Sequence, residues 1–377
     1  MPTSSPVRGR LAALTAPAEL VRPEGGKVRC VACGHRCLIG EGHEGVCKVR
    51  FVSEGVLRVP FGYVASVAAD PIEKKPFFHV TPGATALSFG MLGCDYKCPY
   101  CQNWEISQTG RDPETDEYAR PRRTSPEELV GLAREQGATM VTSTYNEPLI
   151  TSEWAAAVFR PARAAGLLTS YVSNGNGTPE VIDYLRPLVD AYKVDLKAMR
   201  DEPYRSVGGR LQAVLDTLRL LVARSFWVEV VTLLVPGFND SDEELRDAAR
   251  FLSGLSPDIP WHLTAFHPDY RMTDRGATGL HSLLRAVEIG REEGLRYVYA
   301  GNLPGRVGDG ESTRCPGCGA VAVERRGFRV LANRLLPGGR CPGCQARLAG
   351  LWTLEEALAA RPDPSPGRKL TPSSASA

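Results

Sequence analysis

From residue 86 to about residue 302, the chain alternates short apolar, β-branched runs with longer amphipathic stretches. The short runs predict β-strands and the longer stretches predict helices, three of which follow a serine or threonine N-cap (Ser125, Thr178 and Ser241). Alternation with short connections indicates parallel strands joined by helical crossovers, in a βα barrel or a doubly wound sheet. The predicted strands are 86–91, 139–144, 168–172, 191–196, 227–235, 261–266 and 297–300; the predicted helices are 126–136, 179–188, 242–252 and 281–293.

Polar residues gather where these strands end, at 145–148, 173–177, 195–197, 236–240, His267 and Asn302. In a βα barrel all these ends lie on one face, which is where such barrels carry their active sites. Taken singly, Asn174 with Gly175 and Asn239 with Asp240 are also ordinary turn or helix-cap residues, and Glu147 can be read as a cap. Their recurrence after several strands favours an enzyme.

Three cysteines, Cys94, Cys98 and Cys101, follow the first of these strands on one short loop. Iron-sulfur clusters and closed zinc sites both take four protein ligands, so three thiols predict a metal centre with one open position. The alternatives are a zinc knuckle that borrows a distant ligand, or three unrelated buried thiols.

The other eight cysteines form one group before the strands and one after them: Cys30, Cys33, Cys37 and Cys47, then Cys315, Cys318, Cys341 and Cys344. An odd total of eleven and this clustering favour metal sites over disulfides. The first group suits zinc or an iron-sulfur cluster, with His35 or His43 as substitute ligands, in a structural or auxiliary role. The second, two Cys-Pro-Gly-Cys turns, predicts a zinc-ribbon or rubredoxin-like site for zinc or a single iron.

The 45 basic and 43 acidic side chains nearly cancel, and the arginines Arg325, Arg326, Arg329 and Arg334 are expected on a solvated face, so nucleic acid is an unexpected partner. There is no signal-peptide core and no run long enough to span a membrane, so we expect a cytoplasmic protein. We divide the chain into a flexible segment (1–27), a cysteine-rich cap with a β connection that includes a hairpin at 56–68 (28–83), a core (84–305), a ribbon module (306–355) and a disordered tail (356–377).

The cysteine loop, with Tyr100 before its last cysteine, resembles the signature of the radical S-adenosylmethionine (SAM) superfamily. The segments Asp-Pro-Ile-Glu-Lys-Lys-Pro (70–76), Leu-Ser-Phe-Gly (87–90) and Cys-Gln-Asn-Trp-Glu-Ile-Ser-Gln (101–108) resemble the AmmeMemoRadiSam-system radical SAM enzymes, relatives of the pyruvate formate-lyase activating enzymes. The resemblance extends over residues 30–352.

This resemblance implies a partial (β/α)6-type TIM-like barrel with a small cysteine-rich cap and a C-terminal ribbon module. It implies that Cys94, Cys98 and Cys101 hold a [4Fe-4S] cluster whose open iron binds SAM. One electron, from an external flavodoxin- or ferredoxin-type donor, then cleaves SAM to a 5'-deoxyadenosyl radical that abstracts hydrogen from a substrate. The residues that match SAM-contacting segments are Tyr100, Asn146, Glu147, Ser173, Asn174, Asp195 and Lys197.

The family name implies Memo-type and AMMECR-type partner proteins. One departure weakens any transfer of glycyl-radical activation: residues 109–123 contain no cysteine, whereas many such activases carry extra clusters there. The substrate is therefore left open between a small molecule and a partner protein that receives a radical, and no catalytic residue is identified. The alternative class is a non-catalytic, zinc-rich module that binds nucleic acid or protein.

Overall fold

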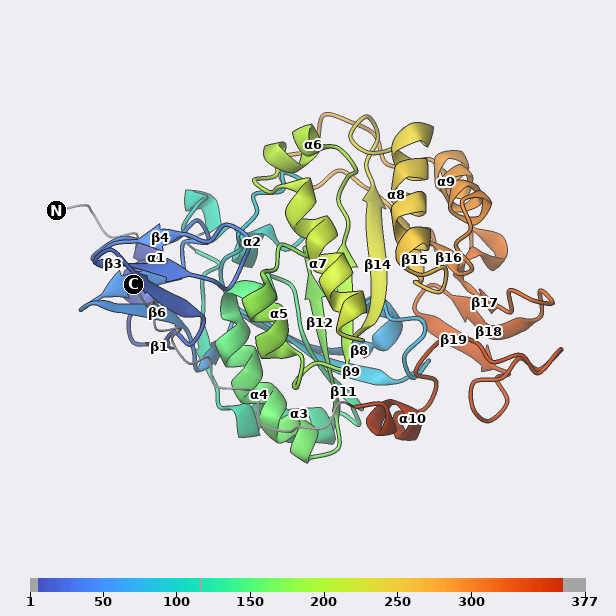
Figure 1. Ribbon diagram of the computed structural model, residues 1–377, viewed down its shortest axis with the longest axis horizontal. Helices are drawn as coiled ribbons and strands as arrows, with labels where there is room; N and C mark the ends of the chain where they lie inside the picture. Colours follow the sequence, from blue (N-terminus) through green and yellow to red (C-terminus); the bar gives the residue numbers. More distant parts are fainter. Residues whose placement is uncertain (1–5, 116, 362–377) are drawn as a thin grey trace, which may run out of the picture.

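A computed structural model describes residues 6–115 and 117–361, which are built around one eight-stranded sheet (Figure 1). Strands β9 and β11 to β16 are parallel to one another, and β8 joins the edge of the sheet antiparallel to β9. In sheet order they are β16 (Val298–Gly301), β15 (Trp261–Ala265), β14 (Trp227–Leu234), β13 (Ala191–Asp195), β12 (Leu168–Ser173), β11 (Met140–Ser143), β9 (Thr85–Gly90) and β8 (Ser66–Pro71). The predicted α/β class and mostly parallel sheet are confirmed, with β8 and β16 as open edges.

Helices follow most of the parallel strands and pack against the sheet. Side chains of Ser125, Thr178 and Ser241 accept backbone N–H groups at the starts of their helices, as predicted. Two long helices, α4 and α7, were not predicted, because α4 contains Pro161 and neither helix has a side-chain N-cap bond. The helices are α3 (Pro126–Glu135), α4 (Ser152–Ala164), α5 (Pro179–Leu185), α6 (Asp201–Ser206), α7 (Leu211–Ala223), α8 (Asp242–Leu255) and α9 (Leu280–Glu292).

The segment before the sheet differs from the sequence expectations in two ways. Residues 6–27, expected to be flexible, include α1 (Pro6–Leu11), β1 (Thr15–Pro17) and β2 (Val21–Glu24); β1 pairs with β6 (Val56–Pro60), and β2 pairs with β3 (Lys27–Cys30). The expected hairpin at 56–68 is instead formed by β5 (Phe51–Ser53) and β6, while β8 joins the large sheet. The shorter elements in this segment are β4 (Leu38–Ile39), β7 (Tyr63–Val64) and η1 (Ile72–Lys74). Those between the strands of the large sheet are α2 (Trp104–Ser107), η2 (Pro113–Thr115), β10 (Arg122–Arg123) and η3 (Pro148–Thr151).

The C-terminal module is a three-stranded antiparallel sheet of β17 (Thr313–Arg314), β18 (Val321–Arg326) and β19 (Arg329–Asn333), preceded by η4 (Gly308–Glu311). Residues 356–361, expected to belong to a disordered tail, are ordered. Helix α10 (Leu354–Ala359) spans residue 356, and the Arg361 guanidinium donates to the Asp190 carboxylate. Residues 362–377 of the expected tail lie outside the described residues.

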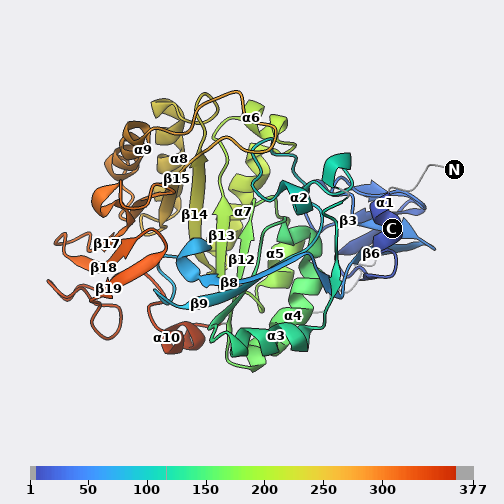
Figure 2. The same cartoon turned by 180° about the vertical axis from the view of Figure 1, so that it is seen from behind.

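The N-terminal ends of the parallel strands are closed by apolar side chains. Ala86, Met140, Leu168 and Ala191 cluster with Ile72, Phe77 and Val80 and with Ala357 of α10. Figure 2 shows α10 beside β8 and β9, and it shows the cap and the ribbon strands at opposite ends of the molecule. The carboxyl ends of the strands are therefore left as the accessible end. None of the described helices is long and apolar enough to cross a membrane.

Candidate active site

A cavity of 1220 Å³ opens at the carboxyl ends of the parallel strands. Its lining includes every residue that the sequence matched to the SAM-contacting segments, together with the three thiols of the central loop. These residues come from four separate stretches of chain, and the parallel sheet brings them together because its strand ends share one edge. They are Cys94, Cys98, Cys101, Tyr100, Asn146, Glu147, Ser173, Asn174, Asp195 and Lys197.

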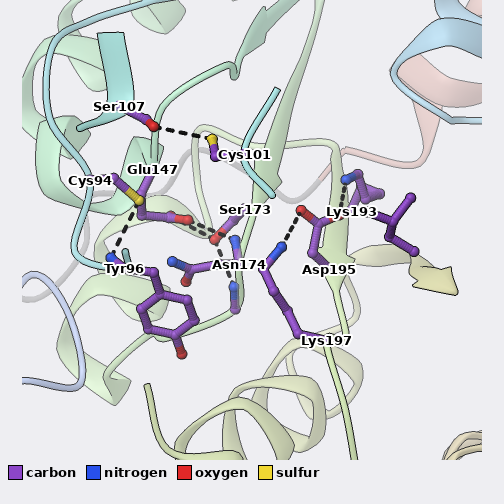
Figure 3. Close-up of polar contacts among 12 residues, drawn as sticks. Cys94, Tyr96, Cys101, Ser107, Glu147, Ser173, Asn174, Lys193, Asp195 and Lys197 are labelled. Atoms are coloured by element: carbon purple, nitrogen blue, oxygen red, sulfur yellow. Dashed lines mark hydrogen bonds and ion pairs between the residues drawn. The ribbon is translucent and has the colours of Figure 1, made fainter. Parts of the chain in front are cut away.

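The cysteine loop starts directly after β9 and is held close to the neighbouring strand. A Cβ on Gly90 would lie 2.8 Å from the Thr144 carbonyl oxygen, so only glycine fits there without movement. The Tyr96 backbone N–H donates to the Cys94 sulfur at 3.4 Å, and the Ser107 hydroxyl lies 3.1 Å from the Cys101 sulfur (Figure 3). Polar donors thus face two of the three sulfurs, as they do in sites that hold thiolates.

Glu147 joins β11 to the end of β12. One of its carboxylate oxygens accepts from the Leu149 N–H at 3.0 Å and the Ser173 hydroxyl at 2.7 Å, and the other accepts from the Asn174 N–H at 2.6 Å. Burial and the nearby Asp95 carboxylate raise the pKa of Glu147, and these three hydrogen bonds oppose that rise. The carboxylate therefore fixes the polar end of β12 against the cavity.

Asp95 is a site residue that the sequence reasoning missed. Its carboxylate is buried and accepts from the side-chain amides of Asn174 at 2.7 Å and Asn176 at 2.8 Å. It therefore connects the cysteine loop to the end of β12. Its position between two cysteines was the available signal, because a buried acid there needs donors from elsewhere in the fold.

Asp195, at the end of β13, lies between two lysines (Figure 3). It forms ion pairs with Lys193 and, at 3.2 Å, with Lys197. Burial alone would raise the pKa of Asp195, but the two ammonium groups lower it to about 2. Lys193 was not predicted as a site residue, because it lies inside an otherwise apolar strand; its alternation with Asp195 places both on the cavity face.

The lining of the cavity also includes Lys75, Tyr145, His262 and Tyr299. Lys75 donates to Asp70 at 2.9 Å and to the Tyr145 hydroxyl at 3.2 Å, and His262 lies 2.7 Å from the buried Glu229 carboxylate. His262 and Tyr299 lie within strands β15 and β16, so they were not found by reading strand ends alone. His79 is fully buried below them, with its ring nitrogens 2.6 Å from the Tyr299 hydroxyl and the Ala349 carbonyl.

The far rim of the cavity is formed by residues 326–330 at the turn between β18 and β19. Arg326 and Arg329 are exposed there, as expected, but Arg325 is fully buried. Its guanidinium donates to the Phe78 carbonyl at 2.7 Å and pairs with the buried Glu73 at 3.3 Å. The prediction that Arg325 is solvated was wrong, because its partner lies 252 residues earlier in the chain.

All eleven cysteines are unpaired, and the three groups differ in how closely their sulfurs approach. In the ribbon, Cys315 and Cys344 are 3.6 Å apart and Cys318 and Cys341 are 3.5 Å apart, and all four sulfurs lie within 4.8 Å of one another. Tetrahedral zinc holds its sulfurs about 3.8 Å apart, so the ribbon group has the size of a single-ion site. Among the described residues, no three cysteines of the cap or of the central loop gather so tightly.

The cap cysteines are nevertheless clustered. Cys30, Cys33 and Cys47 are buried, and the buried Arg50 guanidinium donates to the Cys30 sulfur at 3.6 Å. Of the two histidines considered as substitute ligands, His43 is exposed and His35 has a buried, unpaired Nε2.

Comparison with known proteins places these features in a wider group. The family described as the Radical SAM superfamily matches residues 90–252. An uncharacterised protein, MJ0808, of Methanocaldococcus jannaschii is 38% identical over 325 residues, covering 85% of this chain and 95% of that protein. Pyruvate formate-lyase 1-activating enzyme of Escherichia coli is 26% identical over 193 residues, covering 49% of this chain and 75% of that enzyme. A solved radical SAM methyltransferase from Sphaerobacter thermophilus is 17% identical, covering 80% of this chain and 82% of its own, with a TM-score of 0.46.

Proposed function

This chain belongs to the radical SAM superfamily, and from that membership we propose that it binds SAM in the 1220 Å³ cavity and uses it to abstract a hydrogen atom from a second molecule there. The observation that carries the proposal is the convergence of three thiols and the polar ends of β11, β12 and β13 on one cavity.

The residues present fit a [4Fe-4S] cluster with one open iron. Cys94, Cys98 and Cys101 supply three thiolates on one loop, and the Tyr96 N–H and Ser107 hydroxyl face two of the sulfurs. A cluster held by these three thiolates would supply the electron for reductive cleavage of SAM to methionine and a 5'-deoxyadenosyl radical.

The protein's own residues bind, orient and enclose SAM. We propose that Asn146 and Glu147 face the SAM amino group, that Ser173 and Asn174 contact its ribose and carboxylate, and that the Tyr100 backbone contacts adenine. Asp195 and Lys197 supply opposite charges beside them. The buried network of Glu147 and Asp95 keeps the end of β12 fixed, so that these contacts need little reorganisation on binding.

The second molecule then occupies the part of the cavity between Lys75 and the ribbon turn at 326–330. Arg326 and Arg329 supply positive charge here, and Lys74 and Lys75 share the single carboxylate of Asp70, so this part keeps a positive charge that favours a substrate with acidic groups. In the small-molecule case, deuterium from a labelled substrate would appear in 5'-deoxyadenosine.

A second candidate is radical transfer to a partner protein. Its support is the homology to pyruvate formate-lyase activating enzymes and the exposed Phe328 and Leu331, which lie at the ribbon turn and on β19 beside the cavity rim. A stable radical left on the partner would distinguish it. The non-catalytic nucleic-acid-binding alternative loses one of its four ribbon arginines, because Arg325 is buried in an ion pair.

We further propose membership of the AmmeMemoRadiSam system, with Memo-type and AMMECR-type partners, a flavodoxin- or ferredoxin-type donor, a cytoplasmic location and zinc or a single iron in the ribbon. The order of the three cysteine groups and the segment 70–76 support the family assignment. Co-purification from the native host tests the partners, and recovery of neither protein would count against them.

Anaerobic reconstitution tests the central proposal. Reduced protein should give an electron paramagnetic resonance (EPR) signal that SAM perturbs, and should form 5'-deoxyadenosine. Cys98→Ala should remove both, whereas Cys344→Ala, in the ribbon, should keep the SAM-perturbed signal. A Cys98→Ala protein that behaved like the native one would refute the assignment.

A further inference from the structure

The cap contacts the central cysteine loop at Cys47, one of the four cap cysteines. A Cβ on Gly93, the residue before Cys94, would lie 2.9 Å from the Cys47 carbonyl oxygen and 2.7 Å from the Val49 side chain. The backbones next to one ligand of each group are thus in contact, and no side chain separates them there.

Arg111 links the same two backbones by hydrogen bonds. A single guanidinium nitrogen, Nη2, donates to the Val46 carbonyl at 2.8 Å and to the Cys94 carbonyl at 3.1 Å. Val46 precedes Cys47 in the chain. Through this nitrogen, the residue next to a cap cysteine is therefore connected by hydrogen bonds to the backbone of a loop cysteine.

The rest of the cap is anchored to the elements around the SAM-facing end of β12. The Gly34 N–H donates to the Asn176 carbonyl at 2.8 Å, and the Thr178 hydroxyl donates to the Val31 carbonyl at 2.6 Å. Arg50, which donates to the Cys30 sulfur, forms a buried ion pair with Glu153 of α4. The cap is therefore held in one position relative to the loop.

Sulfur spacing separates the cap from the ribbon. Among the described cysteines, only the ribbon group brings three or more sulfurs within 4.8 Å of one another, the spacing of a single ion. The cap resembles the central loop in having wider spacing, and a four-iron cluster is itself several ångströms across and holds its thiolates farther apart. The buried Arg50 donor to the Cys30 sulfur also suits an anionic thiolate centre.

We propose that Cys30, Cys33, Cys37 and Cys47 hold a second [4Fe-4S] cluster, which passes electrons to the loop cluster across the Gly93 and Arg111 contacts. This rests on the proposed function for the loop cluster itself. A ferredoxin- or flavodoxin-type protein reduces the cap cluster by one electron. The cap cluster is then reoxidised as the loop cluster is reduced by the same electron, and no bond or proton changes place. Because the cap has four thiolates, its cluster has no open iron and does not bind SAM.

The test is a metal count joined to EPR on the full-length, anaerobically reconstituted protein. Native protein should contain two clusters' worth of iron and sulfide, and after reduction by dithionite should show two signals, of which SAM perturbs one. Cys37→Ala should remove the SAM-insensitive signal and one cluster's worth of iron and sulfide, and Cys98→Ala should leave the SAM-insensitive signal. Zinc in the cap, lost on Cys37→Ala with no loss of iron, would overturn the inference.

The two proposals fail in different ways. Absence of any SAM-perturbed signal would refute the proposed function, whereas a SAM-perturbed signal with one cluster's worth of iron would refute only the second cluster. If Cys37→Ala does not fold, the native metal count decides.

Arg111→Lys tests the route, because lysine has one nitrogen and cannot reproduce the bonds of the guanidinium to Val46, Cys94 and Tyr96. With unchanged iron content, freeze-quenched samples reduced by flavodoxin should show several-fold slower appearance of the SAM-sensitive signal. An unchanged rate would overturn the assigned route.

Discussion

Replacing Glu147 with glutamine should weaken SAM binding and leave all three thiols of the cysteine loop in place. The carboxylate accepts three hydrogen bonds, from the Leu149 N–H, the Ser173 hydroxyl and the Asn174 N–H. A glutamine has one acceptor oxygen and one NH2 group. In one orientation the NH2 group faces the Asn174 N–H, and in the other it faces the Leu149 N–H. Either orientation leaves one backbone N–H in this buried site without an acceptor.

An unsatisfied buried N–H costs about 1–3 kcal/mol. The free protein can relieve this cost by moving the end of β12, whereas the proposed SAM contacts of Ser173 and Asn174 require both residues in place. If the cost falls on the bound form, the dissociation constant for SAM should rise about 5- to 150-fold. Isothermal titration of SAM into the reconstituted protein, with the loop signal followed by EPR, measures the change.

Asp190→Asn is the matched control. Asp190 is also a buried carboxylate that accepts a backbone N–H of β12, from Thr169 at 2.9 Å, but it lies at the opposite end of that strand. The Asp190→Asn substitution should lower the free energy of unfolding and leave SAM affinity unchanged. If Glu147→Gln binds SAM within about two-fold of the native protein, then Glu147 does not position this end of the strand, and the reasoning is wrong.

Three further predictions concern stability and metal content. Burial holds the pKa of His79 at about 4, so as the pH falls below about 6.5 the unfolded chain takes up a proton before the folded protein does. The free energy of unfolding should therefore be lower by about 2 kcal/mol at about pH 5. Urea unfolding measures this loss, and His79→Gln should flatten its pH dependence. Arg325→Met should cost about 3–5 kcal/mol because it leaves Glu73 buried and unpaired, whereas the neighbouring, exposed Arg326→Met should stay within about 0.5 kcal/mol by the same assay. Cys341→Ser should remove the ribbon metal while the SAM-perturbed EPR signal persists, as metal analysis beside EPR would show; loss of the signal would contradict a single-ion site independent of the loop.

The parallel sheet was predictable because each strand has its own local pattern of apolar residues. Once those strands are parallel, their carboxyl ends lie at one edge of the sheet, and the sequences of the loops do not change this. This is why Asn146, Ser173 and Asp195 line one cavity although they are far apart in the chain. Local signals at helix starts succeeded for the same reason, since Ser125 and its helix are neighbours in sequence.

The contacts that the sequence did not reveal depend on distant partners. Arg50 and Glu153 are 103 residues apart, and nothing near either residue indicates that the other will be buried against it. Asp95 likewise becomes a site residue only when β12 brings Asn174 and Asn176 to it. A charged residue is usually exposed, so sequence reasoning reads each of these groups as solvated until the fold supplies its partner.

The two outer cysteine modules contact different parts of the active site, and this separates what each can influence. The cap touches the central loop through Gly93 and Arg111, whereas the ribbon turn at 326–330 forms the far rim beside Lys74 and Lys75. A disturbance in the cap therefore reaches the thiols first, and a disturbance in the ribbon reaches the substrate end first. From this arrangement we expect Arg111→Lys to slow reduction of the loop cluster, and Arg329→Ala to weaken substrate binding with no change in the rate of that reduction. If Arg329→Ala slowed reduction as much as Arg111→Lys, the cavity would act as one coupled unit, and the division between an electron side and a substrate side would be wrong.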